Sequence, residues 1–280
     1  MNLERTESQT IYEPRIFHAG LLAPIMRVLI LSSGGKDSCY SVWWSLLKGW
    51  DVAGIVTVQI DGDDSMMFQL PASQVAGLQA SSSKIPWLTV NLSGTPEEEM
   101  LELREYLKPI IDGDYASKIW NEDEWLRYWP NDWSRPIIEQ FNPNEKIDAI
   151  VTGALRSDYQ KTRIERMAYD LGVKSFNPLW HHDPYSHMRD LVDHGFELLF
   201  TSVSADGLNQ EWLGTVLNHE SLMRLFELSK KHRFSIDGEG GEFETTVINA
   251  PWMGKKISIT GDAIWCGHNG YYHINDAKLL

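Results

Sequence analysis

The stretch VLILSSGGKDSCYSVWWSLLK, residues 28–48, joins a short apolar run to a helical segment through a turn rich in serine and glycine. Residues 28–31 are all apolar, as in strands buried on both faces of a parallel sheet, and residues 37–48 are expected to form a helix. The turn SGGKDS at 33–38 lies where a doubly wound sheet binds its ligand. Its glycines let the backbone approach an anion closely, and the helix start adds free N–H groups. The stretch therefore predicts an α/β fold with an anion-binding loop.

The side chains of this loop indicate which anion it binds. Lys36 contributes a positive charge, and the hydroxyls of Ser33 and Ser38 can donate hydrogen bonds to phosphate oxygens. Asp37 would repel a phosphate unless a cation lies between them, so we assign it to a Mg²⁺ ion that bridges nucleotide phosphates. A Walker A loop is excluded because Ile30 and Asp37 stand where that motif needs Gly and Ser or Thr, and no GxGxxG fingerprint is present. The alternative is an ordinary polar turn before a helix.

The organisation of the chain is consistent with this loop. Strand-like and helix-like patterns alternate from residue 27 to about 204, which predicts a doubly wound parallel sheet with helices on both faces. Further strands are expected at 52–58 and 149–151, and short β-like runs after residue 234 predict a smaller C-terminal α+β subdomain. The expected divisions are an N-terminal extension at 1–25, a nucleotide-binding domain at 26–204 with a Trp-rich insert at 112–145, and a C-terminal substrate-binding subdomain at 205–280.

Local signals mark two helix starts and one irregular segment. Thr95 with Glu98, and Ser157 with Gln160, match the capping-box pattern, in which each pair satisfies backbone N–H groups at a helix start. The insert at 112–145 carries several tryptophans among acids, Asn and Pro, and it interrupts the alternation. We expect it to be either a lid over a site or a locally packed excursion.

A second candidate motif is GALRSDYQ at 153–160, which follows a predicted strand and opens a helix. Because the carboxyl ends of parallel strands meet at one edge of the sheet, Asp158, Tyr159, Gln160 and Arg163 are expected to face the same crevice as the phosphate loop. Arg163 can neutralise phosphate, and Asp158 can assist Mg²⁺ or orient a second substrate. For each of these two residues a structural ion pair is the open alternative.

A third candidate motif is GEGGEFET at 238–245. Its glycines permit a tight or positive-φ backbone, from which Glu239, Glu242 and Glu244 project carboxylates. Such a loop is expected to interact with a cation. A glycine-rich hairpin with solvated acids is the alternative.

The cluster His181, His182, Asp183 and His187 raises the question of a metal site, since imidazole and carboxylate are common ligands. Asp183 before Pro184 is better explained as a helix cap. We therefore interpret the histidines as surface residues near a helix start.

Composition excludes several classes of protein. The net charge of −14 disfavours a nucleic-acid partner, because such affinity comes largely from Lys and Arg. Cys39 and Cys266 are the two cysteines and form no CxxC, so neither a disulfide framework nor a structural zinc site is indicated. The apolar stretch at 21–31 contains Pro24 and Arg27, which disfavours a signal peptide or membrane span. We expect a cytoplasmic protein with no membrane partner, and a homo-oligomer is left open.

These motifs resemble known families at two levels. SGGKDS directly after a first strand is the signature of the PP-loop ATP pyrophosphatase superfamily, whose members cleave ATP between the α- and β-phosphates. GALRSDYQ at 153–160 with PLW at 178–180, and GEGGEFET at 238–245 with AP at 250–251, resemble the diphthine–ammonia ligase family. The resemblance covers about residues 26–260.

The resemblance implies ATP and Mg²⁺ as cofactors and an amide-forming reaction. A substrate carboxylate would attack the α-phosphate of ATP to give an acyl-adenylate and pyrophosphate, and ammonia from free ammonium would then displace AMP. The expected acceptor is diphthine on elongation factor 2, which makes the partner a protein. Its trimethylammonium group can be held by the carboxylates of the GEGGEFET loop together with the aromatic face of Phe243, Trp180 or Trp212.

The resemblance also assigns roles to residues. Catalytic roles are expected for Lys36, Asp37 and Asp158, and the metal is expected on Asp37. ATP is expected to be bound by Ser33, Gly34, Gly35, Lys36, Asp37, Ser38, Gly153 and Arg163. The acceptor is expected to be bound by Tyr159, Gln160, Gly240, Gly241, Glu242, Phe243, Glu244 and Thr245.

The chain departs from the family pattern in ways that concern the acceptor more than the ATP chemistry. Gln69 stands where we expect histidine, and the Trp-rich insert and the N-terminal extension are unusual. Two alternatives therefore stay open, a PP-loop ligase acting on a different small carboxylic acid and a nucleotide-binding module that senses ATP without turnover. A tRNA-modifying role is disfavoured by the acidic charge and the lack of a paired catalytic cysteine.

Overall fold

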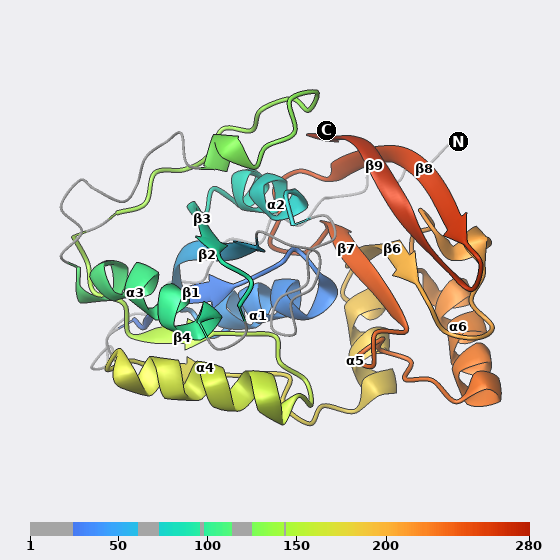
Figure 1. Ribbon diagram of the computed structural model, residues 1–280, viewed down its shortest axis with the longest axis horizontal. Helices are drawn as coiled ribbons and strands as arrows, with labels where there is room; N and C mark the ends of the chain where they lie inside the picture. Colours follow the sequence, from blue (N-terminus) through green and yellow to red (C-terminus); the bar gives the residue numbers. More distant parts are fainter. Residues whose placement is uncertain (1–24, 61–72, 96–97, 114–124, 143) are drawn as a thin grey trace, which may run out of the picture.

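The computed structural model describes residues 25–60, 73–95, 98–113, 125–142 and 144–280 (Figure 1). The extension at 1–24, the stretch around Gln69 and part of the Trp-rich insert lie outside the described residues. Among the described helices, none is long and apolar enough to cross a membrane.

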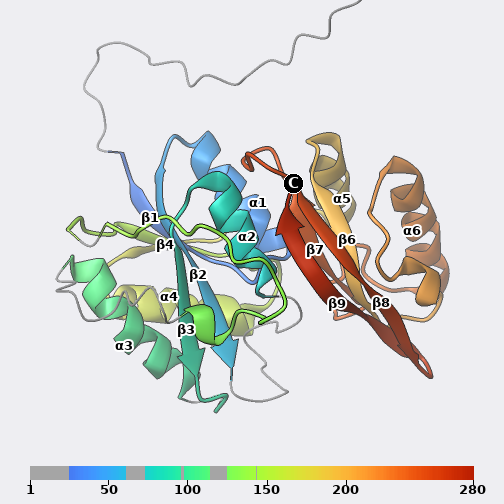
Figure 2. The same ribbon diagram turned by 90° about the horizontal axis from the view of Figure 1, so that it is seen from above.

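The N-terminal part is built on a five-stranded sheet in the order β3-β2-β1-β4-β5, with every neighbouring pair parallel. The expected doubly wound sheet is confirmed. Its strands are β1 (Arg27–Leu31), β2 (Asp51–Ile60), β3 (Trp87–Leu92), β4 (Ala149–Val151) and β5 (Lys174–Phe176). Its helices are α1 (Lys36–Leu47) and α2 (Val75–Ser83) on one face and α3 (Glu99–Asp112) and α4 (Asp158–Asp170) on the other (Figure 2).

The alternation of side chains along β1 explains the two helical layers. Leu29 and Leu31 point to one face and pack in a cluster with residues of α3 and α4, whereas Val28 and Ile30 pack on the opposite face with residues of α1 and α2. A strand covered on both sides must be apolar at every position. The continuous apolar run in the sequence reflects that requirement.

The C-terminal part is built on a second, four-stranded sheet in the order β7-β6-β9-β8, whose paired strands are antiparallel. Helices α5 and α6 share a core with β6 and β7, and the other face of the sheet contributes to the cluster that contains α1 and α2. The elements are α5 (Pro184–Asp193), β6 (Glu197–Val203), the 3-10 turn η2 (Gln210–Trp212), α6 (His219–His232), β7 (Phe243–Asn249), β8 (Ile257–Cys266) and β9 (Asn269–Leu279).

The position of β6 corrects one expectation. The sequence pattern predicts a parallel sheet that includes every strand up to about residue 204, yet β6 pairs with β7 and β9 instead. The antiparallel sheet therefore begins before residue 205. A buried strand has the same apolar signature in either sheet, and its partners, β7 and β9, lie far along the chain.

The described part of the Trp-rich insert packs against the protein core. Trp125 lies in the 3-10 turn η1 (Trp125–Arg127) and packs edge to face on Trp129, with 5.5 Å between the ring centroids. Trp129 packs on Trp133 in the same way, with 5.7 Å between the centroids. All three side chains are buried in the same core cluster as Trp87, and Trp133 Nε1 donates a hydrogen bond to the carbonyl of Asn275 at 3.0 Å. Of the two expectations for the insert, this described part corresponds to the packing excursion.

The sequence predicts three helix starts with a capping residue, at Thr95, Ser157 and Asp183, and the structure confirms two of them. Ser157 caps α4 by accepting from the Gln160 N–H, and Asp183 caps α5 by accepting from the Ser186 N–H, as expected. The predicted start at Thr95 is wrong, because α3 begins at Glu99 with Glu98 as the N-cap residue. The N–H groups of Glu98 and Glu99 both donate to the Thr95 carbonyl, at 2.9 Å.

Candidate active site

A pocket lies at the carboxyl ends of β1 and β4, where β7 of the second sheet approaches the parallel sheet. Strand ends of this kind are where open α/β sheets bind ligands. Over the residues that the structure describes, the pocket is lined by Leu31, Ser32, Ser33, Gly35, Lys36, Asp37, Ser38, Val56, Val58, Thr152, Gly153, Ala154, Ser157, Gln160, Ile164, Glu239, Phe243, Glu244 and Thr245.

The turn between β1 and α1 is held in a left-handed conformation by buried hydrogen bonds. Gly34 has φ +84°, which an L side chain rarely adopts. Its N–H donates to Ser32 Oγ at 3.1 Å, and its carbonyl accepts from the Val247 N–H and from Gln79 Nε2, both at 3.0 Å. Ser32 Oγ also donates to Ser38 Oγ at 2.9 Å. A strand of the second sheet, β7, and helix α2 therefore fix the loop.

The first turn of α1 presents its backbone N–H groups to this pocket. Gly35 is the N-cap residue, and within the described residues no side chain caps the helix, so the first-turn donors are open to a ligand. The loop after β4 packs tightly behind this turn, since a Cβ on Gly153 would lie 2.6 Å from the Asp37 carbonyl carbon. Open donors, the positive end of the helix dipole and Lys36 fit the phosphate groups of a nucleotide.

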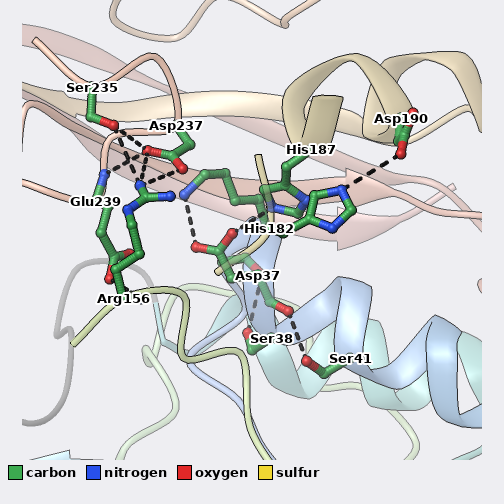
Figure 3. A network of polar contacts seen from close by, with 12 residues as sticks. Asp37, Ser38, Ser41, Arg156, His182, His187, Asp190, Ser235, Asp237 and Glu239 are labelled. Carbon is green, nitrogen blue, oxygen red and sulfur yellow. Dashed lines mark hydrogen bonds and ion pairs between the residues drawn. The ribbon is translucent and has the colours of Figure 1, made fainter. Parts of the chain in front are cut away.

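Asp37 is the centre of a network of charged groups (Figure 3). Its Oδ2 forms an ion pair with Lys36 Nζ at 2.8 Å, and its Oδ1 lies 2.7 Å from Nε2 of His187, which comes from α5. Burial by itself would raise the pKa of Asp37, but Lys36 and His187 outweigh it and hold the pKa below its usual range. The Asp37 carboxylate is therefore ionised at neutral pH.

His187 corrects an expectation from the sequence. It is fully buried rather than at the surface, and its ring packs edge to face on Tyr40. His182 and His181 are partly exposed and exposed, respectively. A helical stripe of His187, Met188, Leu191 and Val192, all buried, is the signal that indicates an interior position for His187.

The donor set fits Mg²⁺ only as an ion shared with a nucleotide. Within the described residues, no group of three or more His, Cys, Asp or Glu side chains is arranged to hold a metal. Mg²⁺ is usually bound by one or two carboxylates together with phosphates and water, and the ionised Asp37 supplies one such carboxylate in the pocket. The assignment of Mg²⁺ to Asp37 stays a prediction.

The GEGGEFET loop adds two carboxylates to the pocket and uses a third to stabilise itself. Glu242 accepts hydrogen bonds from the N–H groups of Ser235 and Gly240, at 2.9 and 2.7 Å, and is not among the described residues lining the pocket. Glu239 and Glu244 do line it. Burial raises the pKa of both, and the negative charge of Asp37 raises that of Glu239 further.

Arg156 and Asp237 connect the two parts of the molecule beside this pocket. The guanidinium Nη2 of Arg156 contacts both carboxylate oxygens of Asp237, at 2.7 and 2.6 Å, and Ser235 Oγ donates to the same carboxylate at 2.6 Å. Asp237 is fully buried. The Arg156 backbone N–H donates to Glu239 at 3.2 Å, so the same residue also holds the loop that carries Glu239.

Helix α4 presents a different face to the pocket from the one expected. Ser157, Gln160 and Ile164 line it, whereas Asp158, Tyr159 and Arg163 are not among its described lining residues. Positions three, four and seven residues apart share a helix face, and the expected residues are offset from that stripe. The Arg163 guanidinium instead lies 3.6 Å from the centre of the Tyr159 ring.

The aromatic residues suggested for cation binding do not come together at the pocket. Phe243 lines it, although its ring is buried and packs on Phe200 at 5.1 Å. The Trp180 ring is in cation–π contact with the Lys161 ammonium, and the ring of the buried Trp212 is in the same contact with the Arg224 guanidinium. Neither tryptophan is among the pocket-lining residues of the described chain.

The remaining expected residues divide between the pocket and its supports. Ser33, Gly35, Lys36, Asp37, Ser38 and Gly153 of the expected ATP site line the pocket, as do Gln160, Phe243, Glu244 and Thr245 of the expected acceptor site. Gly34, Gly240 and Gly241 shape the two loops. The pocket and its supports also include five residues that the sequence does not predict there: Ser32, Thr152, His187, Arg156 and Asp237. The roles given to all of these residues stay predictions.

Comparison with known proteins places this arrangement in a family. The chain matches the description "Diphthamide synthase N-terminal domain" over residues 26–123 and "Diphthamide synthase C-terminal domain" over residues 183–280. A protein of Schizosaccharomyces pombe named diphthine–ammonia ligase is 30% identical over 239 residues, which are 84% of this chain and 36% of that protein. The Rattus norvegicus protein of the same name is 28% identical, with 85% of each chain covered.

A solved structure also aligns with the chain. It is described as a predicted subunit of tRNA methyltransferase from Methanocaldococcus jannaschii, and it superposes with a TM-score of 0.35 at 18% sequence identity. The alignment covers 81% of this chain and 98% of that one.

Proposed function

Because the chain belongs to the diphthamide synthase family, we propose that it is an ATP-dependent carbon–nitrogen ligase that amidates diphthine on elongation factor 2 with ammonium. The observation that carries the proposal is the open first turn of α1 beside Lys36 and Asp37, in a pocket that carboxylates of the second sheet also enter. The two parts of the pocket suit the two halves of such a reaction.

ATP would bind with its phosphates at the first turn of α1. The backbone N–H groups of that turn, the ammonium of Lys36 and the hydroxyls of Ser33 and Ser38 are donors for phosphate oxygens. Lys36 is almost fully buried and already paired with Asp37, so it is held in place before the nucleotide arrives. Such preorganised donors stabilise charge without rearranging during the reaction.

The chemistry would proceed in two steps. An oxygen of the diphthine carboxylate forms a bond to the α-phosphorus, the bond from that phosphorus to the bridging oxygen breaks, and pyrophosphate leaves. Ammonia, formed when ammonium loses a proton, then attacks the acyl carbon; AMP leaves and a second proton is lost from nitrogen. Lys36 and the α1 amides would stabilise the charge on pyrophosphate. A Mg²⁺ ion held by Asp37 would supply further charge neutralisation.

The charges of the pocket favour a cationic second substrate. Among its described lining residues, Lys36 is the positive side chain, against the carboxylates of Asp37, Glu239 and Glu244. Such a pocket needs added cations before it accepts ATP, and both ammonium and the trimethylammonium group of diphthine are cations. Glu239 and Glu244 enter from the second part of the molecule, and their carboxylates can pair with that cationic group.

The test measures AMP and pyrophosphate from ATP, Mg²⁺ and ammonium, with and without elongation factor 2 that carries diphthine. We expect turnover that requires the modified factor and that is lost in Asp37→Ala. Asp193→Ala, which removes an exposed carboxylate of α5, should behave as wild type. Cleavage independent of the factor would indicate a different carboxylic acid, and tight ATP binding without cleavage would indicate a sensor; either result would refute the proposal.

A further inference from the structure

His187 is a buried polar residue that packing does not explain. It lies on the face of α5 that contacts α1, between core residues such as Met188 and Leu191, and it is 0% exposed. An apolar side chain would fill such a position without any polar atom to satisfy. The presence of an imidazole there calls for a polar function.

The hydrogen bonding of His187 identifies the group on which it acts. A carboxylate oxygen accepts hydrogen bonds, so Nε2 of His187 donates to Asp37 Oδ1 at 2.7 Å. The other ring nitrogen, Nδ1, is buried and has no partner among the described residues. Since buried polar atoms are normally paired, the ring keeps its bond to Asp37 at the cost of leaving Nδ1 unsatisfied.

The contact with His187 restricts what Asp37 can do. Figure 3 shows His187 reaching Asp37 from α5. With Oδ1 bound in this way, rotation of the carboxylate is limited, and Oδ2 is left to pair with Lys36. Hydrogen bonds of this kind orient carboxylates that bind metals and tune them, as outer partners do in known metal sites. His187 reaches Asp37 from 150 residues away, and from the C-terminal part of the chain.

We propose that His187 is a positioning residue, which fixes the orientation of Asp37 so that Oδ2 and Lys36 together meet the metal–nucleotide complex. The proposal rests on the function proposed above and adds a residue to its machinery. It differs from a purely structural role, because it requires a donor at the position of Nε2 and not merely a side chain of the right volume.

The test compares His187→Leu, which removes the donor, with His187→Gln, whose amide nitrogen can take the place of Nε2. The matched control is His219→Gln, because His219 also donates to an aspartate, Asp193, at 2.8 Å but at the surface. The probe is α,β-methylene-ATP, which cannot be cleaved between the α- and β-phosphates. Its Kd is measured calorimetrically with and without Mg²⁺, and thermal unfolding is followed in parallel.

We expect His187→Leu to keep a midpoint of unfolding close to that of wild type while the tightening of analogue binding by Mg²⁺ falls by about tenfold to a hundredfold. His187→Gln should recover most of that tightening, and His219→Gln should not change it. The proposal is overturned if the leucine variant shows the wild-type Mg²⁺ effect, or if a stably folded glutamine variant loses as much as the leucine variant. If the leucine variant does not fold, the glutamine variant decides: it is expected to keep most of the wild-type Mg²⁺ effect, and a loss of about tenfold or more in a folded glutamine variant overturns the proposal.

The design separates this inference from the proposed function. A wild-type protein that binds the analogue more tightly with Mg²⁺ but does not use diphthine would refute the ligase proposal and leave the role of His187 to be judged by the Kd ratio. A wild-type protein whose analogue binding does not respond to Mg²⁺ would overturn the role of His187, whatever the acceptor.

Discussion

Replacing Arg156 should destabilise the fold more than replacing its ion-pair partner Asp237, because the two side chains differ in exposure. The Asp237 side chain is 0% exposed, whereas that of Arg156 is 29% exposed. Replacing Arg156 by Met keeps most of the side-chain length but leaves a fully buried carboxylate with only the Ser235 hydroxyl and a long contact from the Glu239 N–H at 3.4 Å. Replacing Asp237 by Asn leaves an arginine that can still reach water.

The magnitudes follow from these exposures. Breaking a buried pair so that one charge stays uncompensated costs roughly 3–5 kcal/mol, and the partial exposure of Arg156 places this case near 3 kcal/mol. Asp237→Asn keeps the acceptor oxygen and the bond from Ser235, so it should cost about 1.5 kcal/mol. At about 2–3 °C per kcal/mol for a chain of this size, Arg156→Met should lower the unfolding temperature by roughly 6–9 °C and Asp237→Asn by roughly 3–5 °C.

Urea and thermal unfolding of both single variants and of the double variant would test this reasoning. The double variant contains no buried charge, so it should be more stable than Arg156→Met alone. Lys108→Met, which breaks an exposed pair with Asp112, serves as the control and should cost under about 1 kcal/mol. If Arg156→Met cost no more than Asp237→Asn, the argument from burial of Asp237 would be refuted.

Three further predictions concern the pocket and the cysteines. Burial raises the pKa of Glu244, so its ionised form is less favourable in the folded than in the unfolded chain. Glu244→Gln should therefore unfold at a higher temperature than wild type at pH 7. Thermal scans from pH 4 to 8 should show this gain vanish as the pH falls towards the unfolded pKa of about 4.3. A gain that grew on acidification would contradict this. Gly153→Ala would bring a Cβ within 2.6 Å of the Asp37 backbone, so it should lower the free energy of unfolding by about 1–3 kcal/mol. It should also weaken the binding of an ATP analogue, measured by calorimetry. Unchanged affinity would argue against this contact supporting the phosphate site. Ellman's reagent should label the exposed Cys266 but not Cys39, because Cys39 is buried and burial raises the pKa of its thiol. Fast labelling that persists in Cys266→Ser would count against the buried position of Cys39.

The parts of the fold that the sequence predicts well are those decided by neighbouring residues. The strand, glycine turn and helix at 28–48 each have a local signal, and the cap at Ser157 depends on a hydrogen bond to a residue three positions away. The order of strand, turn and helix is therefore predicted, although α1 begins at Lys36 and not at Asp37. The phosphate-binding role of the loop stays a prediction.

The parts that the sequence does not predict depend on partners distant in the chain. Strand β6 has an ordinary buried pattern, and only its pairing with β7 and β9 assigns it to the second sheet. On α4, the cap places the helix start, but the packing of α4 on the sheet decides that Gln160 and not Tyr159 faces the pocket. For His187, helical periodicity indicates burial, whereas its contact with Asp37 follows from the docking of α5 on α1.

The hydrogen bonds to the Gly34 carbonyl also bear on how a newly synthesised chain becomes competent. The loop residues leave the ribosome before β7, which supplies the Val247 N–H that binds this carbonyl; neighbouring Thr246 lies 212 residues after Gly34. At 5–20 residues per second, translation takes roughly 10–40 s to cover that separation. The signature motif is thus among the first described parts of the chain to be made, and its loop must wait for β7 to acquire its final hydrogen bonds.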